Sequence, residues 1–112
     1  MFGRQALPSV RSADVSADAF LLDVREEDEF RAGHAPGAVH VPMMQVPGRL
    51  DEIPTDRDVV VACRVGGRSA QVVAYLRAQG RDNVRNLTDG MLGWAASGRP
   101  LITEDGSAPG IL

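Results

Sequence analysis

Lysine is absent from this chain, and cysteine is nearly absent, with a single residue at position 63. One cysteine excludes an internal disulfide, so a chain of 112 residues must fold on its hydrophobic core alone. All 12 basic residues are therefore arginines, against 15 acidic residues, which gives a formal net charge of −3. An acidic balance of this kind argues against general binding to nucleic acid.

Long apolar runs are also missing. The longest runs, residues 59–63 and 72–76, are far shorter than the ~20 residues that a membrane-spanning helix needs. Residues 1–10 contain no apolar segment of signal-peptide length. We therefore expect a cytoplasmic protein without membrane contact, and a monomer.

The chain that remains alternates strand patterns with helix patterns, at spacings too long for hairpins. This order predicts an α/β fold with a small central, mainly parallel sheet and helices on both faces. We expect one domain over residues 1–102, and a mobile tail over residues 103–112, which are rich in small residues, glycine and proline. The expected strands cover residues 9–10, 19–24, 38–41, 59–62 and 84–87, and the expected helices cover residues 26–32, 69–79 and 89–96.

Residues 59–69 carry the strongest chemical signal. Three valines and an alanine form a buried strand that ends on Cys63, a loop with two glycines follows, and a helix begins near Ser69. Strand, tight loop and helix start place the thiol among converging backbone N–H groups, at the positive end of a helix dipole. Such a cup suits an anion, and the thiolate of Cys63 would be its first occupant.

Each of these residues also has a plainer interpretation. A lone cysteine that ends an apolar strand often only packs in the core, and two glycines can simply form a tight turn. Arg64 and Arg68, which flank the glycines on an acidic protein, favour an anion site instead. His34 and His40 have no zinc-like spacing to the cysteine, so we expect structural roles for them and no metal or cofactor.

With these residues laid out, the chain resembles single-domain rhodanese-like proteins over residues 21–100, approximately. The sequence departs from the usual pattern at Gly67, where asparagine is common, and at Met91, where a second glycine is usual. The loss of one side-chain amide at Gly67 bears on substrate preference. Four motifs in the family's order carry the resemblance: LDVR at 22–25, GHAPGA at 33–38, CRVGGRS at 63–69 and LTDGMLGW at 87–94.

The resemblance implies a sulfurtransferase. The Cys63 thiolate would take the outer sulfur of thiosulfate or a related donor as a persulfide, and would pass it to cyanide or a thiol, including a possible protein acceptor. Arg25 can bind substrate by this resemblance, or it can brace the acidic turn at Glu29. The implied substrate-binding set is Arg64, Val65, Gly66, Gly67, Arg68, Ser69 and Arg25.

Two alternatives remain at this point. The first is a non-catalytic rhodanese-like module that docks a partner or carries sulfur, although such a module has no evident need for the cysteine of an intact loop. The second and weaker one is a cysteine-dependent phosphatase. Those enzymes place five residues between cysteine and arginine, whereas here only residues 64–67 separate Cys63 from Arg68.

Overall fold

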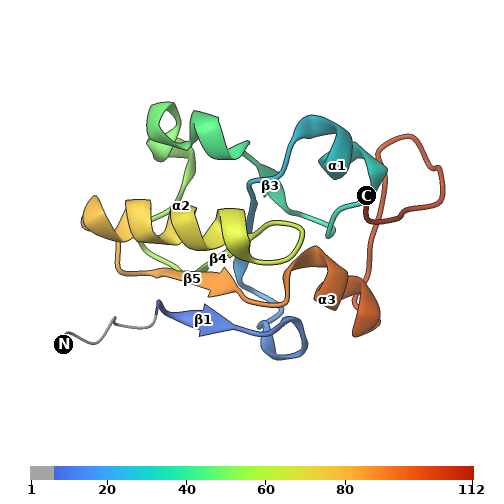
Figure 1. Cartoon of the computed structure of the whole chain (residues 1–112), viewed down its shortest axis with the longest axis horizontal. Coiled ribbons are helices and arrows are strands. Elements are labelled where there is room, and N and C mark those ends of the chain that lie inside the picture. Colours follow the sequence, from blue (N-terminus) through green and yellow to red (C-terminus); the bar gives the residue numbers. More distant parts are fainter. Residues whose placement is uncertain (1–6) are drawn as a thin grey trace.

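The structure is a computed structural model that describes residues 7–112 (Figure 1). Its first element is the short strand β1, and each later strand except β3 is followed by an α-helix. The strands are β1 (Ser9–Val10), β2 (Phe20–Asp23), β3 (Val39–His40), β4 (Val59–Ala62) and β5 (Val84–Leu87). The helices are α1 (Glu27–Ala32), α2 (Gly67–Ala78) and α3 (Gly90–Ala96), with short 3-10 helices η1 (Ser12–Asp14), η2 (Met43–Gly48) and η3 (Leu50–Glu52).

The strands form one sheet in the order β1-β5-β4-β2-β3. Each neighbouring pair of strands is parallel. β4 lies at the centre of the sheet, in register with β2 through Asp23 and Ala62, and with β5 through Val61 and Asn86. The predicted α/β fold with a mainly parallel sheet is confirmed. Among residues 7–112, no helix has the length and apolar character needed to cross a bilayer.

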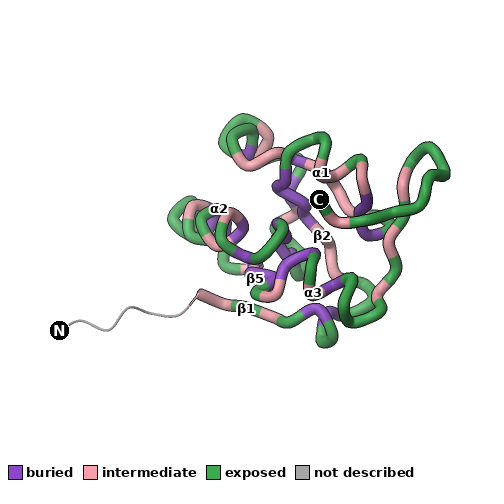
Figure 2. Tube along the Cα trace, turned by 45° about the vertical axis from the view of Figure 1, so that its right-hand side comes forward, coloured by how far each residue is buried: buried purple, intermediate pink, exposed green. Residues whose placement is uncertain are grey.

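β4 is buried on both faces, as its run of valines predicts. Because side chains alternate along a strand, Val59, Val61 and Cys63 join a core cluster with the buried side of α2. Val60 and Ala62 face a second cluster, which includes Met91 and Trp94 of α3. In Figure 2 the buried stretches gather along the strands, and the helices are largely exposed outside them. The alternation therefore places the cysteine on the same side of the sheet as α2.

Helix boundaries follow from capping. α1 begins with a capping box in which the side chains of Glu26 and Glu29 each accept from the other residue's backbone N–H. α2 begins at Gly67, two residues earlier than its apolar pattern indicates, and it ends just before Gly80, whose φ of +85° stops the helix.

The segment after α3 is largely exposed, but it is attached to the domain near both of its ends. Ile102 pairs with His34 in an antiparallel bridge, and the N–H of Gly110 donates to the carbonyl of Ala32 at 2.8 Å. Ile111 packs against the core cluster that contains Trp94. In Figure 1 this red segment returns toward α1, so that the C-terminal end lies near that helix. Backbone pairing and one apolar side chain thus give residues 102–111 a docked path at its two ends, and the mobility that composition predicts for residues 103–112 stays a prediction.

Gly33 offers a test of that path. Its φ of 168° is extended backbone that any residue adopts, so the left-handed conformation is not the reason for a glycine here. A Cβ at this position would instead lie 2.6 Å from the carbonyl oxygen of Gly110. We expect Gly33→Ala to displace residues 110–112 and to speed amide hydrogen exchange across 103–112. The matched control is Gly48→Ala, whose Cβ meets nothing within 4 Å. Unchanged exchange in Gly33→Ala would contradict the docked path.

Candidate active site

The Cys63 loop lies where the topology of the sheet favours a site. From β2 the chain continues to β3 on one side, whereas from β4 it continues to β5 on the other. Functional loops in parallel sheets cluster at the carboxyl ends of the strands at such a switch point. Cys63 directly follows β4, and Asp23 is the last residue of β2.

The thiol of Cys63 lies beneath a ring of donors. The backbone N–H groups of Gly66 and Ser69 donate to Sγ, at 3.1 and 3.4 Å, and the hydroxyl oxygen of Ser69 lies 3.3 Å from it. The Cys63 residue is only 1% exposed. The structure thus brings together the predicted nucleophile and the first turn of α2, so that a negative charge on sulfur would be met by N–H groups already in position.

These contacts have a consequence for ionisation. Burial raises the pKa of the Cys63 thiol, because a charged sulfur loses its hydration. The hydroxyl of Ser69 and the backbone N–H groups of Ser69, Gly66 and Val65 outweigh burial, and the pKa lies below its ordinary value. A lowered pKa increases the thiolate fraction near neutral pH, and the thiolate is the nucleophilic form.

Gly66 is required in the loop both for its backbone conformation and for its lack of a side chain. Its φ is +102°, in the left-handed region, and a Cβ would lie 2.6 Å from the carbonyl oxygen of Thr88. Gly67 differs, because a Cβ there meets nothing within 4 Å. The two glycines are therefore not equivalent: the loop requires the first and tolerates a side chain at the second.

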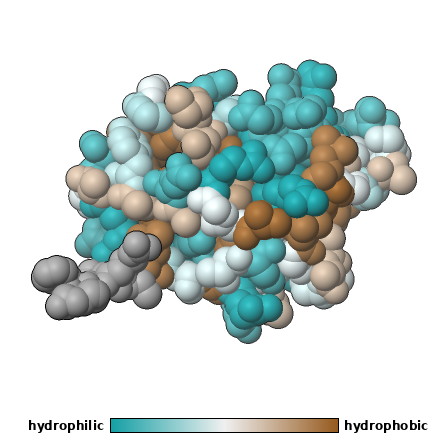
Figure 3. Space-filling view, viewed as in Figure 1, coloured by the Kyte–Doolittle hydropathy of each residue, from teal (hydrophilic) through white to brown (hydrophobic). Residues whose placement is uncertain are grey.

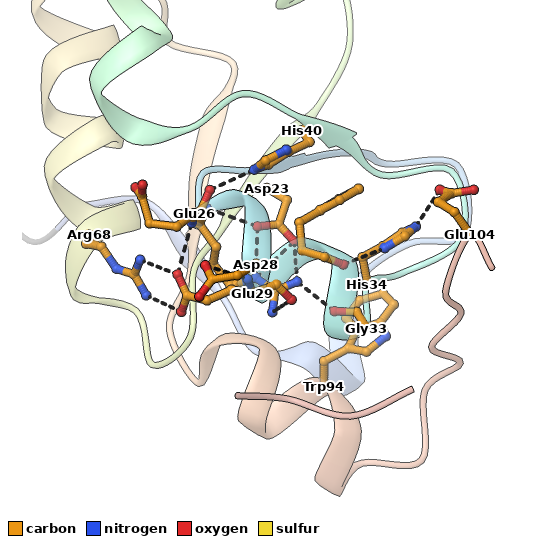
Figure 4. Close-up of polar contacts among 12 residues, drawn as sticks. Asp23, Glu26, Asp28, Glu29, Gly33, His34, His40, Arg68, Trp94 and Glu104 are labelled. Carbon is orange, nitrogen blue, oxygen red and sulfur yellow. Dashed lines mark hydrogen bonds and ion pairs between the residues drawn. The ribbon is translucent and has the colours of Figure 1, made fainter. Parts of the chain in front are cut away.

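Arg68 reaches across to α1. Its two terminal nitrogens donate to the two carboxylate oxygens of Glu29, at 2.7 and 2.9 Å (Figure 4). This pair is the main reason that the pKa of Glu29 is lowered from 4.5 to about 2, and it raises the pKa of Arg68. Glu29 thus already balances part of the positive charge of Arg68, which the sequence predicts to bind the anionic substrate. The pair also fixes α1 against the start of α2.

The lowered pKa of Glu29 predicts a pH dependence. The paired carboxylate contributes its full stabilisation above the unfolded pKa of 4.5, and that contribution is lost as the pH falls through about 2. We expect Glu29→Gln to lower stability at pH 7 by roughly 1 kcal/mol. Its deficit against the unmodified protein should then shrink below pH 4.5. Thermal unfolding at several pH values measures this.

Glu27→Gln is the matched control for that experiment. Glu27 pairs with Arg31 one turn along α1, and both side chains are about 70% exposed. We expect a change within about 0.5 kcal/mol at any pH. A deficit for Glu29→Gln that stays constant down to pH 2 would contradict the assigned pKa.

The mouth of the loop is mixed in character. Arg64 is exposed, and its Nε donates to the main-chain oxygen of Leu112 at 2.6 Å. Val65 and Leu112 are both more than half exposed. The face shown in Figure 3 is largely hydrophilic and carries limited hydrophobic patches. The C-terminal segment therefore borders the loop through Arg64, and the rim combines a cation with apolar side chains.

Arg25 is not part of that mouth. The residue is fully buried, and its guanidinium pairs with both carboxylate oxygens of Asp23. Further bonds go to the main-chain oxygens of Glu29 and Gly33. The sequence left two roles open for Arg25, and the geometry supports the brace over substrate binding, because its hydrogen bonds are directed to the protein interior.

The two histidines make packing contacts outside the Cys63 loop. Both rings stack on Phe30, with centroids 3.8 Å away for His34 and 4.4 Å away for His40. His34 additionally contacts Glu104 of the C-terminal segment at 3.0 Å (Figure 4). Across residues 7–112, no cluster of three or more His, Cys, Asp or Glu residues could hold a metal ion.

Sequence reasoning missed two contributors to the loop. Asn86 of β5 bonds the Ser69 hydroxyl and the Gly66 carbonyl. Gly90 packs closely against the loop, since a Cβ added there would lie only 2.2 Å from the carbonyl oxygen of Arg64. A signal existed for Asn86, since it is a polar residue near the carboxyl end of the strand beside β4. A hollow elsewhere, between η2 and α2, is lined by Met43, Val46, Pro47, Gln71, Val72 and Tyr75, none of which belongs to the loop.

Comparison with known proteins agrees with this geometry. The model of the rhodanese-like domain family matches residues 9–97. A sulfurtransferase of Allochromatium vinosum is 45% identical over 98 residues, 88% of this chain and 91% of its own. A thiosulfate sulfurtransferase, GlpE of Actinobacillus succinogenes, is 36% identical over 82% of this chain and 83% of its own. The crystal structure of a rhodanese-related protein from Thermoplasma volcanium matches with a TM-score of 0.80 and 27% identity, over 87% of this chain and 99% of that one.

The chain therefore belongs to the rhodanese-like family. Both the resemblance identified from the four motifs and the predicted fold are confirmed. Its relatives include proteins named as sulfurtransferases, which supports the general class of activity expected from the sequence. The family match ends at residue 97, before the segment that borders Arg64.

Proposed function

We propose that this protein is a sulfurtransferase that carries sulfane sulfur on Cys63, with thiosulfate or a related donor. The Cys63 thiolate attacks the outer sulfur of thiosulfate. A sulfur–sulfur bond to Cys63 forms as the one within thiosulfate breaks, and the electron pair leaves on sulfite. The carbon of cyanide, or the sulfur of a thiolate, then attacks the outer sulfur, and the electron pair returns to Cys63.

One observation carries this proposal: the N–H groups of Gly66 and Ser69 already point at Sγ. These donors stabilise the thiolate before attack and again when it is the leaving group, so the same loop serves both half-reactions. The compact ring suits a small added sulfur atom. Only four residues separate Cys63 from Arg68, which is one fewer than phosphatases use.

Arg64 is the residue best placed for the anionic donor. It lies next to the nucleophile and is exposed, and among residues 7–112 only its Nε is engaged, by Leu112. Its two terminal nitrogens are thus available to the oxygens of a dianion, which a planar guanidinium binds well. Arg68 adds positive potential at the first turn of α2, reduced by its pairing with Glu29.

Steady-state kinetics test the proposal. With thiosulfate and cyanide as the varied pair, we expect parallel lines in double-reciprocal plots, the signature of a covalent intermediate. Mercaptopyruvate and a glutathione persulfide are run as alternative donors. Absence of turnover with all three, in a folded protein, would contradict the proposal and favour the docking or carrier module. Robust turnover of an aryl phosphate would instead revive the phosphatase alternative.

A further inference from the structure

Asn86 holds two parts of the Cys63 loop at once. It lies in β5 opposite Val61 of β4 and is only 6% exposed. Its Oδ1 accepts from the Ser69 hydroxyl at 2.6 Å, and its Nδ2 donates to the carbonyl of Gly66 at 3.2 Å. Both partners also shape the environment of the sulfur, yet Asn86 itself has no hydrogen bond to Cys63.

The orientation of this amide follows from the chemistry of its partners. The carbonyl of Gly66 can only accept a hydrogen bond, so the NH₂ group of Asn86 must face it. The amide oxygen then faces Ser69 and can only accept as well. The single hydroxyl hydrogen of Ser69 is therefore committed to Asn86, and a lone pair of its oxygen is left toward Cys63 Sγ, 3.3 Å away.

This arrangement fits the neutral thiol. A Cys63 S–H can donate to the Ser69 oxygen, while the Ser69 hydroxyl donates to Asn86, and each group is satisfied. The thiolate has no hydrogen to give, so Ser69 helps it only by turning its hydroxyl hydrogen toward sulfur. That turn breaks the bond to Asn86 and leaves a buried amide oxygen without a donor, which is unfavourable.

We propose that Asn86 is a positioning residue that competes with the Cys63 thiolate for the hydroxyl hydrogen of Ser69, and so limits how readily Cys63 ionises. The inference rests on the proposed function for its purpose. A thiolate that forms too easily is a weaker nucleophile, and the best attacking thiol titrates near ambient pH. Asn86 would thus offset part of the stabilisation that the backbone N–H groups give the anion.

The charged groups near the loop do not share this role. Arg68 on α2 is the cation that senses the charge of Cys63, and it is paired with Glu29 on α1. Arg64 is tied to Leu112 at the mouth. The hydrogen bonds of the Asn86 side chain go to Ser69 and Gly66 and not to these residues, so a replacement of Asn86 leaves their charges in place.

The test is a titration of the thiolate by its absorbance near 240 nm, in four proteins: the unmodified chain, Asn86→Ala, Ser69→Ala and the double variant. Asn86→Ala should lower the midpoint by about 0.5 to 1 pH unit, because Ser69 is then free to donate to sulfur. Ser69→Ala removes the hydroxyl for which the thiolate and Asn86 compete, so it is the reference for the double variant. In the Ser69→Ala background, Asn86→Ala should have no further effect.

Asn83→Ala is the matched control, because within the described part of the chain the side chain of Asn83 bonds only to the main-chain oxygens of Pro54 and Arg57. It should not move the midpoint. A rise in the midpoint of Asn86→Ala, or an equal shift with and without Ser69, would overturn the proposal and assign Asn86 to holding the loop through Gly66.

Asn86→Leu, which fills a similar volume, repeats the cycle if the alanine variant does not fold. Failure of both replacements to fold would assign Asn86 to stability and would also overturn the proposal. The titration requires no sulfur donor. Its outcome is therefore independent of whether thiosulfate turnover is observed.

Discussion

Cys63→Ser is expected to abolish sulfur transfer, lowering turnover with every donor by at least about 1,000-fold. The hydroxyl of serine is far less acidic than a thiol and cannot form a persulfide. No other thiol can replace it, since Cys63 is the only cysteine in the chain. Thiocyanate production from thiosulfate and cyanide measures the effect.

The fold should survive this change. A serine hydroxyl can still accept from the N–H groups of Gly66 and Ser69, which now point at Sγ. Thermal unfolding and far-ultraviolet circular dichroism provide the control. Turnover that persists in a folded Cys63→Ser protein would show that the cysteine is not the nucleophile, and the mechanism would have to be abandoned.

The second large effect is expected at Gly66. Alanine there meets both a φ of +102° and the carbonyl oxygen of Thr88 at 2.6 Å, so the loop or the chain just after β5 must move. We expect Gly66→Ala to lower stability by at least about 2 kcal/mol. We expect it to lower kcat/KM by about 100-fold or more, because displaced N–H groups no longer converge on sulfur.

Gly67→Ala is the neighbouring control. The position lies in the first turn of α2 outside the left-handed region, with open space around it. Alanine should leave activity intact and leave stability unchanged or raised by about 0.5 to 1 kcal/mol, through a less flexible unfolded chain. Equal losses for the two variants would show that the loop does not depend on the special conformation of Gly66.

The sequence made the Cys63 loop predictable because its signals are local. A valine run that ends on cysteine, followed by glycines and a helix, specifies a strand, a tight turn and a helix start without knowledge of distant residues. The order of strand and helix patterns was likewise sufficient for the parallel sheet. The start of α2 at Gly67 was less predictable, because its first turn lacks the apolar residues that mark the helix further on.

Roles that depend on tertiary contacts were harder to predict. The sequence around Arg25 is equally compatible with binding substrate and with bracing a turn. Its burial beside Asp23 and Gly33 distinguishes the two roles. In the sequence, Asn86 is only one polar residue in a short strand. It can bond to the Cys63 loop because β5 lies beside β4. The path of residues 103–112 depends on pairing with residues some seventy positions earlier, such as Glu104 with His34.

A persulfide on Cys63 is detected most directly by the intact mass of the purified protein after exposure to thiosulfate, before and after cyanide is added. We expect a gain of one sulfur atom on Cys63, its removal by cyanide, and thiocyanate in the solution. Cys63→Ser treated in the same way should gain nothing. A folded protein that gains no sulfur from thiosulfate, mercaptopyruvate or a glutathione persulfide would contradict the account.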